Sequence, residues 1–74
     1  MNEIYHEYFL RTLCTQLKNG RYSISVEISL ERSDGIKKDV FHENKKYACT
    51  LLQESEKEAI RLGKNLIDMK MVGF

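Results

Sequence analysis

RYSISVEISLER, residues 21–32, alternates apolar and polar side chains without interruption. Because successive side chains of a strand point to opposite faces of a sheet, this pattern predicts a strand with one dry side and one wet side. The apolar side consists of Tyr22, Ile24, Val26, Ile28 and Leu30. Asn19-Gly20 stands just before the stretch, and this dipeptide is a strong signal for a β-hairpin. The stretch therefore predicts an antiparallel sheet that is apolar on one face.

Residues 8–18, YFLRTLCTQLK, fit either an amphipathic helix or a second strand. A two-residue Asn19-Gly20 loop would place Leu17 opposite Tyr22. Continued outward, that register pairs Thr15 with Ile24, Leu13 with Val26, Arg11 with Ile28 and Phe9 with Leu30. In four of these five pairs, the residue from 8–18 places an apolar or threonine side chain on the dry face. A register shift of one residue would move all of these side chains to the solvent-exposed face. We therefore expect a strand, with Arg11 extending its guanidinium to the rim.

The second half of the chain predicts an edge strand and a helix. Ser33-Asp34-Gly35 is typical of a turn, and residues 36–42 carry charges that discourage pairing with other chains. A capping box that starts at Thr50 predicts the start of a helix that occupies the rest of the chain up to a frayed end at residues 71–74. The expected inner face of this helix is Leu52, Ser55, Ala59, Leu62, Leu66 and Met69.

Small residues recur along that helix at Ser55, Ala59 and Gly63. Glycine inside a helix costs about 1 kcal/mol relative to alanine, and close approach of the helix to the sheet would compensate for this cost. The expected fold class is α+β: a three-stranded antiparallel meander (β-β-β) with one C-terminal helix packed on one face. Residues 1–74 are expected to form a single domain.

Composition narrows the class of protein. The chain is 42% hydrophobic and 31% charged, which is typical of a soluble globular domain, and its net charge of +1 gives no general affinity for nucleic acid. The N-terminus lacks a signal-peptide pattern, and no apolar run approaches the ~20 residues of a membrane span. Cys14 and Cys49 have no paired spacing, so we expect free thiols, with a single disulfide as the alternative. A cytoplasmic location with no membrane association is expected.

Reactive residues are few. His6 and His42 are the only histidines, and neither has a cysteine or an acid at a metal-ligand spacing. Nucleophilic catalysis needs a nucleophile, a base and an orienting group in one pocket, and no motif here indicates such a set. We expect a non-enzyme without metal or cofactor, unless the fold joins Cys14 or Cys49 to His42 in a concave pocket.

Binding is the expected activity. In the predicted register, the open face of the sheet carries Tyr8, Leu10 and Cys14, which predicts a protein interface for a homodimer or another partner. A nucleic-acid interface is the alternative class. It would use lysines near the turns, namely Lys37, Lys38, Lys45 and Lys46. Glu27 and Glu31 on the open face would repel phosphate there.

Two short motifs support a resemblance to a known class of proteins. Residues 19–22 read NGRY, and Glu58-Ala59-Ile60, Gly63 and Ile67-Asp68 form the helix pattern EAI-x-x-G-x-x-x-ID. The chain resembles small bacterial proteins of unknown function with a β-β-β-α fold that share these motifs. This resemblance implies the fold and a bacterial origin, and no mechanism.

The predicted element order supports a second resemblance. It is similar to the partial domain of antitoxins that neutralise a small ribonuclease toxin, and to the sheet-plus-helix portion of double-stranded-RNA-binding domains. The resemblance to the antitoxin domain implies a further alternative, in which this chain is the antitoxin-like partner of a small toxin. The chain lacks the basic helix-start signature KK-x-A-K of the double-stranded-RNA-binding domains. The sequence as a whole predicts a non-catalytic accessory or protein-interaction module.

Overall fold

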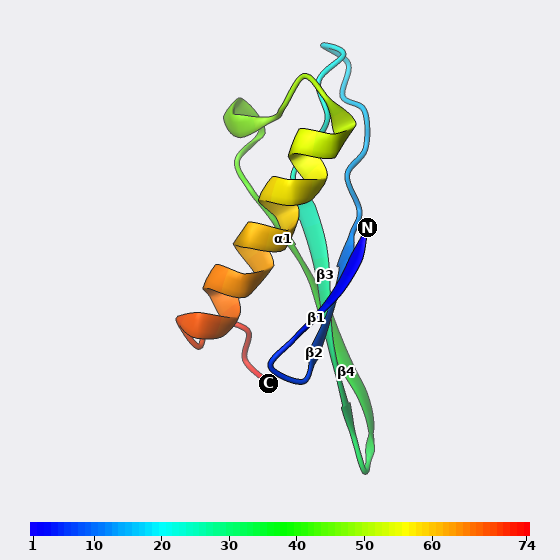
Figure 1. The fold of residues 1–74 in the computed structure, drawn as a ribbon, viewed down its shortest axis with the longest axis vertical. Helices are drawn as coiled ribbons and strands as arrows, with labels where there is room; N and C mark the ends of the chain where they lie inside the picture. Colours follow the sequence, from blue (N-terminus) through cyan, green and yellow to red (C-terminus); the bar gives the residue numbers. More distant parts are fainter.

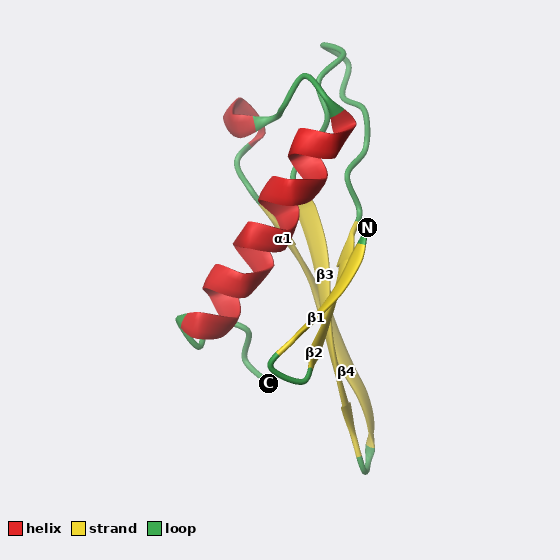
Figure 2. Cartoon of the chain, in the orientation of Figure 1, coloured by secondary structure: helices red, strands yellow, loops and turns green.

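A four-stranded antiparallel sheet and one long helix make up the molecule, in a computed structural model that describes residues 1–74 (Figures 1 and 2). The elements in chain order are β1 (Asn2–Tyr5), β2 (Tyr8–Thr12), β3 (Ser25–Arg32), β4 (Gly35–His42), the 3-10 helix η1 (Lys45–Tyr47) and α1 (Leu52–Asp68). The strands lie in the order β1-β2-β3-β4, and α1 packs against β2 and β3 on one face. The predicted α+β class with a C-terminal helix is confirmed, but the predicted number of strands is wrong, since β1 was not expected.

β1 is joined to β2 by a two-residue loop, His6-Glu7, between the paired residues Tyr5 and Tyr8. Both loop residues have positive φ, 48° for His6 and 73° for Glu7. Positive φ at both central positions defines a type I′ turn, whose twist suits a hairpin but which normally uses Asn and Gly. A four-residue strand followed by this unusual turn sequence gives no recognisable hairpin pattern, which explains why β1 could not be predicted.

The β2–β3 register differs by one residue from the prediction. Phe9 pairs with Ser29 and Leu10 with Ile28, whereas a two-residue loop would have paired Phe9 with Leu30. The cause is the loop length: the amide of Leu17 donates to the carbonyl of Arg21 (2.6 Å), which leaves residues 18–20 as a three-residue loop. Its last residue, Gly20, has φ +85°, as hairpins of this type require. The regular strand is also shorter than expected, because β2 ends at Thr12.

The shift decides which β2 side chain enters the core. Leu10 is completely buried, while Phe9 lies on the other face and is partly exposed. The prediction is confirmed for Ile24, which directly precedes β3, and for Val26 and Ile28 of β3, and all three are buried beneath α1. The complete core cluster consists of Leu10, Ile24, Val26, Ile28, Ala59, Ile60 and Val72.

The small-residue stripe of α1 faces the sheet as predicted. Ser55, Ala59 and Gly63 are buried, and the Ser55 hydroxyl donates to the carbonyl of Tyr22 (2.8 Å). A Cβ atom at Gly63 would lie 3.2 Å from a methyl group of Leu10, so the glycine allows the helix to sit directly on β2. Packing along this stripe sets the position of the helix.

The predicted start of the helix and both ends of its predicted inner face are wrong. The helix begins at Leu52, and its N-cap residue, Leu51, makes no side-chain capping bond, so the predicted Thr50 cap does not form. Leu52 and Met69 are exposed rather than part of the inner face. They flank the buried stripe, beyond the part of the helix that packs on β2 and β3. No helix of the structure is long and apolar enough to span a bilayer.

Polar contacts attach β1 to α1. The Tyr5 hydroxyl donates to the Asp68 carboxylate at 2.8 Å, and Lys64 forms an ion pair with Glu3. The hydrogen bond to Asp68 raises the pKa of Tyr5 above its usual value. At the other end of the strand, Glu56 accepts hydrogen bonds from the Met1 ammonium group and from Thr12, and these bonds lower its pKa. β1 is thus attached chiefly by hydrogen bonds and ion pairs, with the Tyr5 ring packed against the core, whereas β2 and β3 are attached by apolar packing.

The register can be tested by truncating neighbouring residues of β2. Leu10→Ala should lower the free energy of unfolding by about 2–5 kcal/mol, because it opens a cavity against Gly63 and Val26. Phe9→Ala should cost less than about 1 kcal/mol, because its side chain lies on the uncovered face. Urea unfolding monitored by circular dichroism measures both values. A larger loss for Phe9→Ala than for Leu10→Ala would show that the register first expected is the correct one.

The type I′ turn can be tested by giving it its preferred residues. The double substitution His6→Asn, Glu7→Gly should raise the free energy of unfolding by about 1 kcal/mol, because it relieves two left-handed backbone conformations. The matched control is Ser33→Asn, Asp34→Gly in the β3–β4 turn, where neither residue has positive φ. The control should bring no gain. An unchanged urea midpoint in the β1–β2 variant would contradict the strain argued for this loop.

Candidate functional site

The face of the sheet turned away from α1 is uncovered and is the candidate site. The register places its outward side chains in two complete rows across the four strands. One row is Ile4, Phe9, Ser29 and Lys38, and the next is Asn2, Arg11, Glu27 and Val40. Each position follows from strand alternation, because the residues between them point toward the helix. The face is therefore a surface of mixed character, with apolar, polar and charged side chains in each row.

Large apolar side chains are exposed on this face. Ile4 is 72%, Ile36 66%, Phe9 40% and Val40 37% exposed. We call these four residues the open-face patch. Scattered apolar residues are normal on a protein surface, but here one from β1, one from β2 and two from β4 share a single side of a sheet. The sheet presents these side chains at fixed spacing, so a partner could bury them together.

A hollow of about 420 Å³ lies within the open face. It is lined by Ile4, Glu7, Phe9, Ser29, Glu31 and Ile36. Ser29 provides a small side chain between larger neighbours, and its hydroxyl donates to the Phe9 carbonyl (3.4 Å). Glu7 and Glu31 add negative charge. Half of its lining residues are apolar, so the hollow combines apolar surface with negative charge.

The three residues expected to form a protein interface do not lie on the open face. Leu10 is fully buried in the core, so it offers no surface to a partner. Tyr8 and Cys14 are partly buried and pack against the same core, and the Tyr8 hydroxyl donates to the Phe74 carbonyl (2.5 Å). The expected placement is wrong because the three-residue loop shifts the register and turns this strand over. The open face and its β3 residues Glu27, Ser29 and Glu31 lie where they were expected, but the residues that β1 and β2 contribute to it were not anticipated.

The four lysines expected to contact nucleic acid are not gathered in one patch. Lys37 and Lys38 are adjacent on β4 and point to opposite faces of the sheet. Lys45 and Lys46 lie in η1, beyond the other end of that strand. Lys45 instead borders a hollow with Lys18 near the 18–20 loop.

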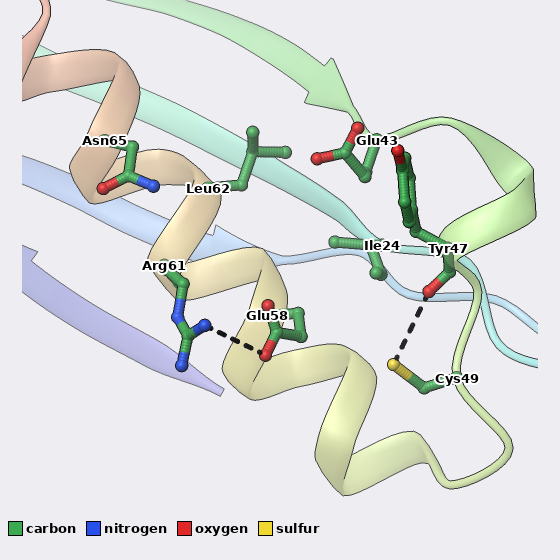
Figure 3. Close-up of a pocket in the computed structure, with 8 residues that line it drawn as sticks. All are labelled: Ile24, Glu43, Tyr47, Cys49, Glu58, Arg61, Leu62 and Asn65. Carbon is green, nitrogen blue, oxygen red and sulfur yellow. Dashed lines mark hydrogen bonds and ion pairs between the residues drawn. The ribbon is translucent and has the colours of Figure 1, made fainter.

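A second depression of about 500 Å³ lies between α1 and the segment that connects β4 to it (Figure 3). Ile24 and Leu62 supply apolar surface, and the remaining lining residues are Glu43, Tyr47, Cys49, Glu58, Arg61 and Asn65. Arg61 pairs with Glu58 at 3.6 Å, and the Cys49 thiol points to the Tyr47 carbonyl (3.8 Å). Neither histidine lines this depression. Its thiol therefore has no imidazole base beside it.

Ser25, His42 and Cys14 do not line any of the depressions. Ser25 Oγ and His42 Nδ1 are 2.9 Å apart, but Ser25 is buried and neither residue lines a pocket. Cys14 and Cys49 are both free, and burial raises the pKa of the Cys14 thiol, which disfavours the nucleophilic thiolate. No group of three or more His, Cys, Asp or Glu side chains is arranged to hold a metal ion.

No family model, curated protein or solved structure matches this chain. The functional argument therefore rests on the geometry of the open face and of the two depressions. The open face stands out because exposed apolar side chains from three strands lie beside charged side chains on one side of the sheet.

Proposed function

We propose that the chain is a non-catalytic protein-interaction module whose docking surface is the open face of its sheet. The observation that carries the proposal is the open-face patch, which spans three strands around the hollow at Ser29. Apolar side chains held on strands lose little conformational freedom on binding, which favours association. Two free thiols support a cytoplasmic setting for this module.

Charge on the open face favours a protein partner over nucleic acid. Glu7, Glu27 and Glu31 outnumber Arg11 and Lys38, so the surface around the patch is negative by one formal charge. Phosphate binding requires the opposite sign, since neutralisation of phosphates by lysine and arginine supplies most of its affinity. The dispersed lysines of β4 and η1 do not compensate for this. A nucleic-acid role would thus need a surface other than the sheet face.

The size of the face sets the expected strength of binding. Four strands spaced about 4.8 Å apart, with the longest about 26 Å in length, give a flat area of roughly 400–500 Å². A standard stable interface buries about 800 Å² of accessible surface on each partner, so this surface lies at or below the low end. We expect micromolar affinity, characteristic of a transient complex, unless the partner also contacts the edges of the sheet.

The proposal can be tested with a photo-crosslinking amino acid at Ile36, in the open-face patch. Discrete protein adducts are expected in cells, and the additional substitution Phe9→Lys should reduce their yield at least fivefold, because it buries a charge in the interface. The same crosslinker at Lys57, on the exposed side of α1, is the control and should give few adducts. Equal yields from both positions would refute the proposed surface, and nuclease-sensitive adducts would support the nucleic-acid alternative.

A further inference from the structure

We infer that the hollow of the open face receives a lysine or arginine side chain from a partner protein. The hollow is the one lined by Ile4, Glu7, Phe9, Ser29, Glu31 and Ile36. This inference rests on the proposed interaction role of the open face, and it adds the chemistry of the residue that the partner presents. Two features of the lining carry it, namely exposed apolar walls and two carboxylates that have no cation partner within the chain.

Three apolar side chains form the walls of the hollow and remain open to water. They are Ile4 of β1, Phe9 of β2 and Ile36 of β4, and all three are classed among the exposed large apolar residues of the chain. An occupant that covers them gains free energy in proportion to the apolar area removed from water. Because the walls come from different strands, the occupant needs an apolar stretch rather than a single methyl group.

Glu7 and Glu31 are the only charged residues that line the hollow. Continuation of the β2–β3 register places Glu7 beside Glu31, because Glu7 precedes β2 by one residue. Like charges on neighbouring strands repel each other and are destabilising. Neither carboxylate takes part in an ion pair within the chain, although three other glutamates do. The hollow thus holds a repulsion that the chain itself does not relieve.

The two cations of the open face leave this charge in place. Lys38 is the β4 partner of Ser29, and Arg11 lies one row further along, beside Glu27. Neither cation lines the hollow, and neither forms an ion pair with an acid of the chain. Since Glu27 offsets its neighbour Arg11, only Lys38 remains to balance two carboxylates. The surroundings of the hollow are therefore negative when every charged residue of the face is counted.

A long basic side chain matches both features of the lining. A purely apolar side chain would take water from two carboxylates without replacing its hydrogen bonds, which is costly. An acidic side chain or a phosphate would add to the repulsion. Lysine and arginine lay their methylene stems along apolar surface and keep the charged end at the rim. There their N–H groups donate charge-assisted hydrogen bonds to carboxylates, which are stronger than those between neutral groups.

Small probes test this chemistry in the free protein. Nα-acetyl-arginine amide should shift the backbone amide NMR signals of Phe9, Ser29 and Ile36. It should bind roughly fivefold more tightly than its neutral analogue, Nα-acetyl-citrulline amide, because only the former carries charge. Methylguanidinium has the charge without the stem, and it should also bind roughly fivefold more weakly than the arginine probe. Equal binding of the arginine and citrulline probes at constant ionic strength would overturn the inference.

Substitution of the carboxylates provides matched variants. The double substitution Glu7→Gln, Glu31→Gln should weaken binding of the arginine probe roughly fivefold and leave the citrulline probe unaffected. It removes no ion pair, so the protein should stay folded, which circular dichroism checks. Glu54→Gln changes an exposed acid of α1 and should have no effect. Unchanged affinity of the double variant for the arginine probe would overturn the inference.

The neighbouring cation gives a test of opposite sign. Lys38→Gln should strengthen binding of the arginine probe about twofold, because it removes the positive charge next to the hollow. Added salt should weaken binding to the parent protein, since it screens the attraction between the probe and the carboxylates. A loss of affinity in the Lys38→Gln variant would show that the probe does not bind at this site.

Crosslinking from Ile36 separates this inference from the proposed function. The double substitution of Glu7 and Glu31 should reduce the yield of protein adducts. Adducts whose yield is unaffected by it would overturn the basic side chain as occupant and still support the docking surface. Probe binding without adducts would assign the hollow to a small guanidinium compound and overturn the protein occupant. The absence of both probe binding and adducts would overturn the proposed function itself.

Discussion

The pairing of Leu10 with Ile28 is the constraint on which the rest of the structure depends. It is imposed by the three-residue loop at residues 18–20, where Gly20 supplies the left-handed conformation. With this register Leu10 points toward α1 and meets Gly63, so the helix can settle closely on the sheet. The same register turns Phe9 and Arg11 outward. Core and open face are thus two results of one hairpin geometry.

One helix is too narrow to cover four strands. The helix packs on β2 and β3 through apolar side chains. It is joined to β1 chiefly by polar contacts, and most of β4 remains exposed. The β3–β4 hairpin extends beyond the other strands, as Figure 1 shows. A small domain built in this way has a thin core and one whole sheet face left over.

Sequence periodicity predicts the parts of this fold where one face is clearly dry. It correctly places Ile24, Val26 and Ile28, at and just before the start of β3, and the small residues of α1 inside. It fails for the β1–β2 hairpin, because the His6-Glu7 turn adopts positive φ without the usual residues. It also fails for the β2 register, because Asn-Gly suits both two-residue and three-residue loops. The sequence therefore predicts that one face of the sheet is open, but the β2 side chains that lie on it follow only from the observed β2–β3 register.

The polar attachment of β1 has a consequence for the dynamics of the molecule. Its hydrogen bonds to β2 lie at the edge of the sheet, and its links to the helix are partly exposed ion pairs and hydroxyl bonds. Such an element opens at a lower free energy than the global unfolding of the core. Native-state hydrogen exchange should thus divide the sheet into a fast unit, β1, and a slow unit formed by β2, β3 and α1. Ile4, which lies on the fast unit, would leave the open face without loss of the fold.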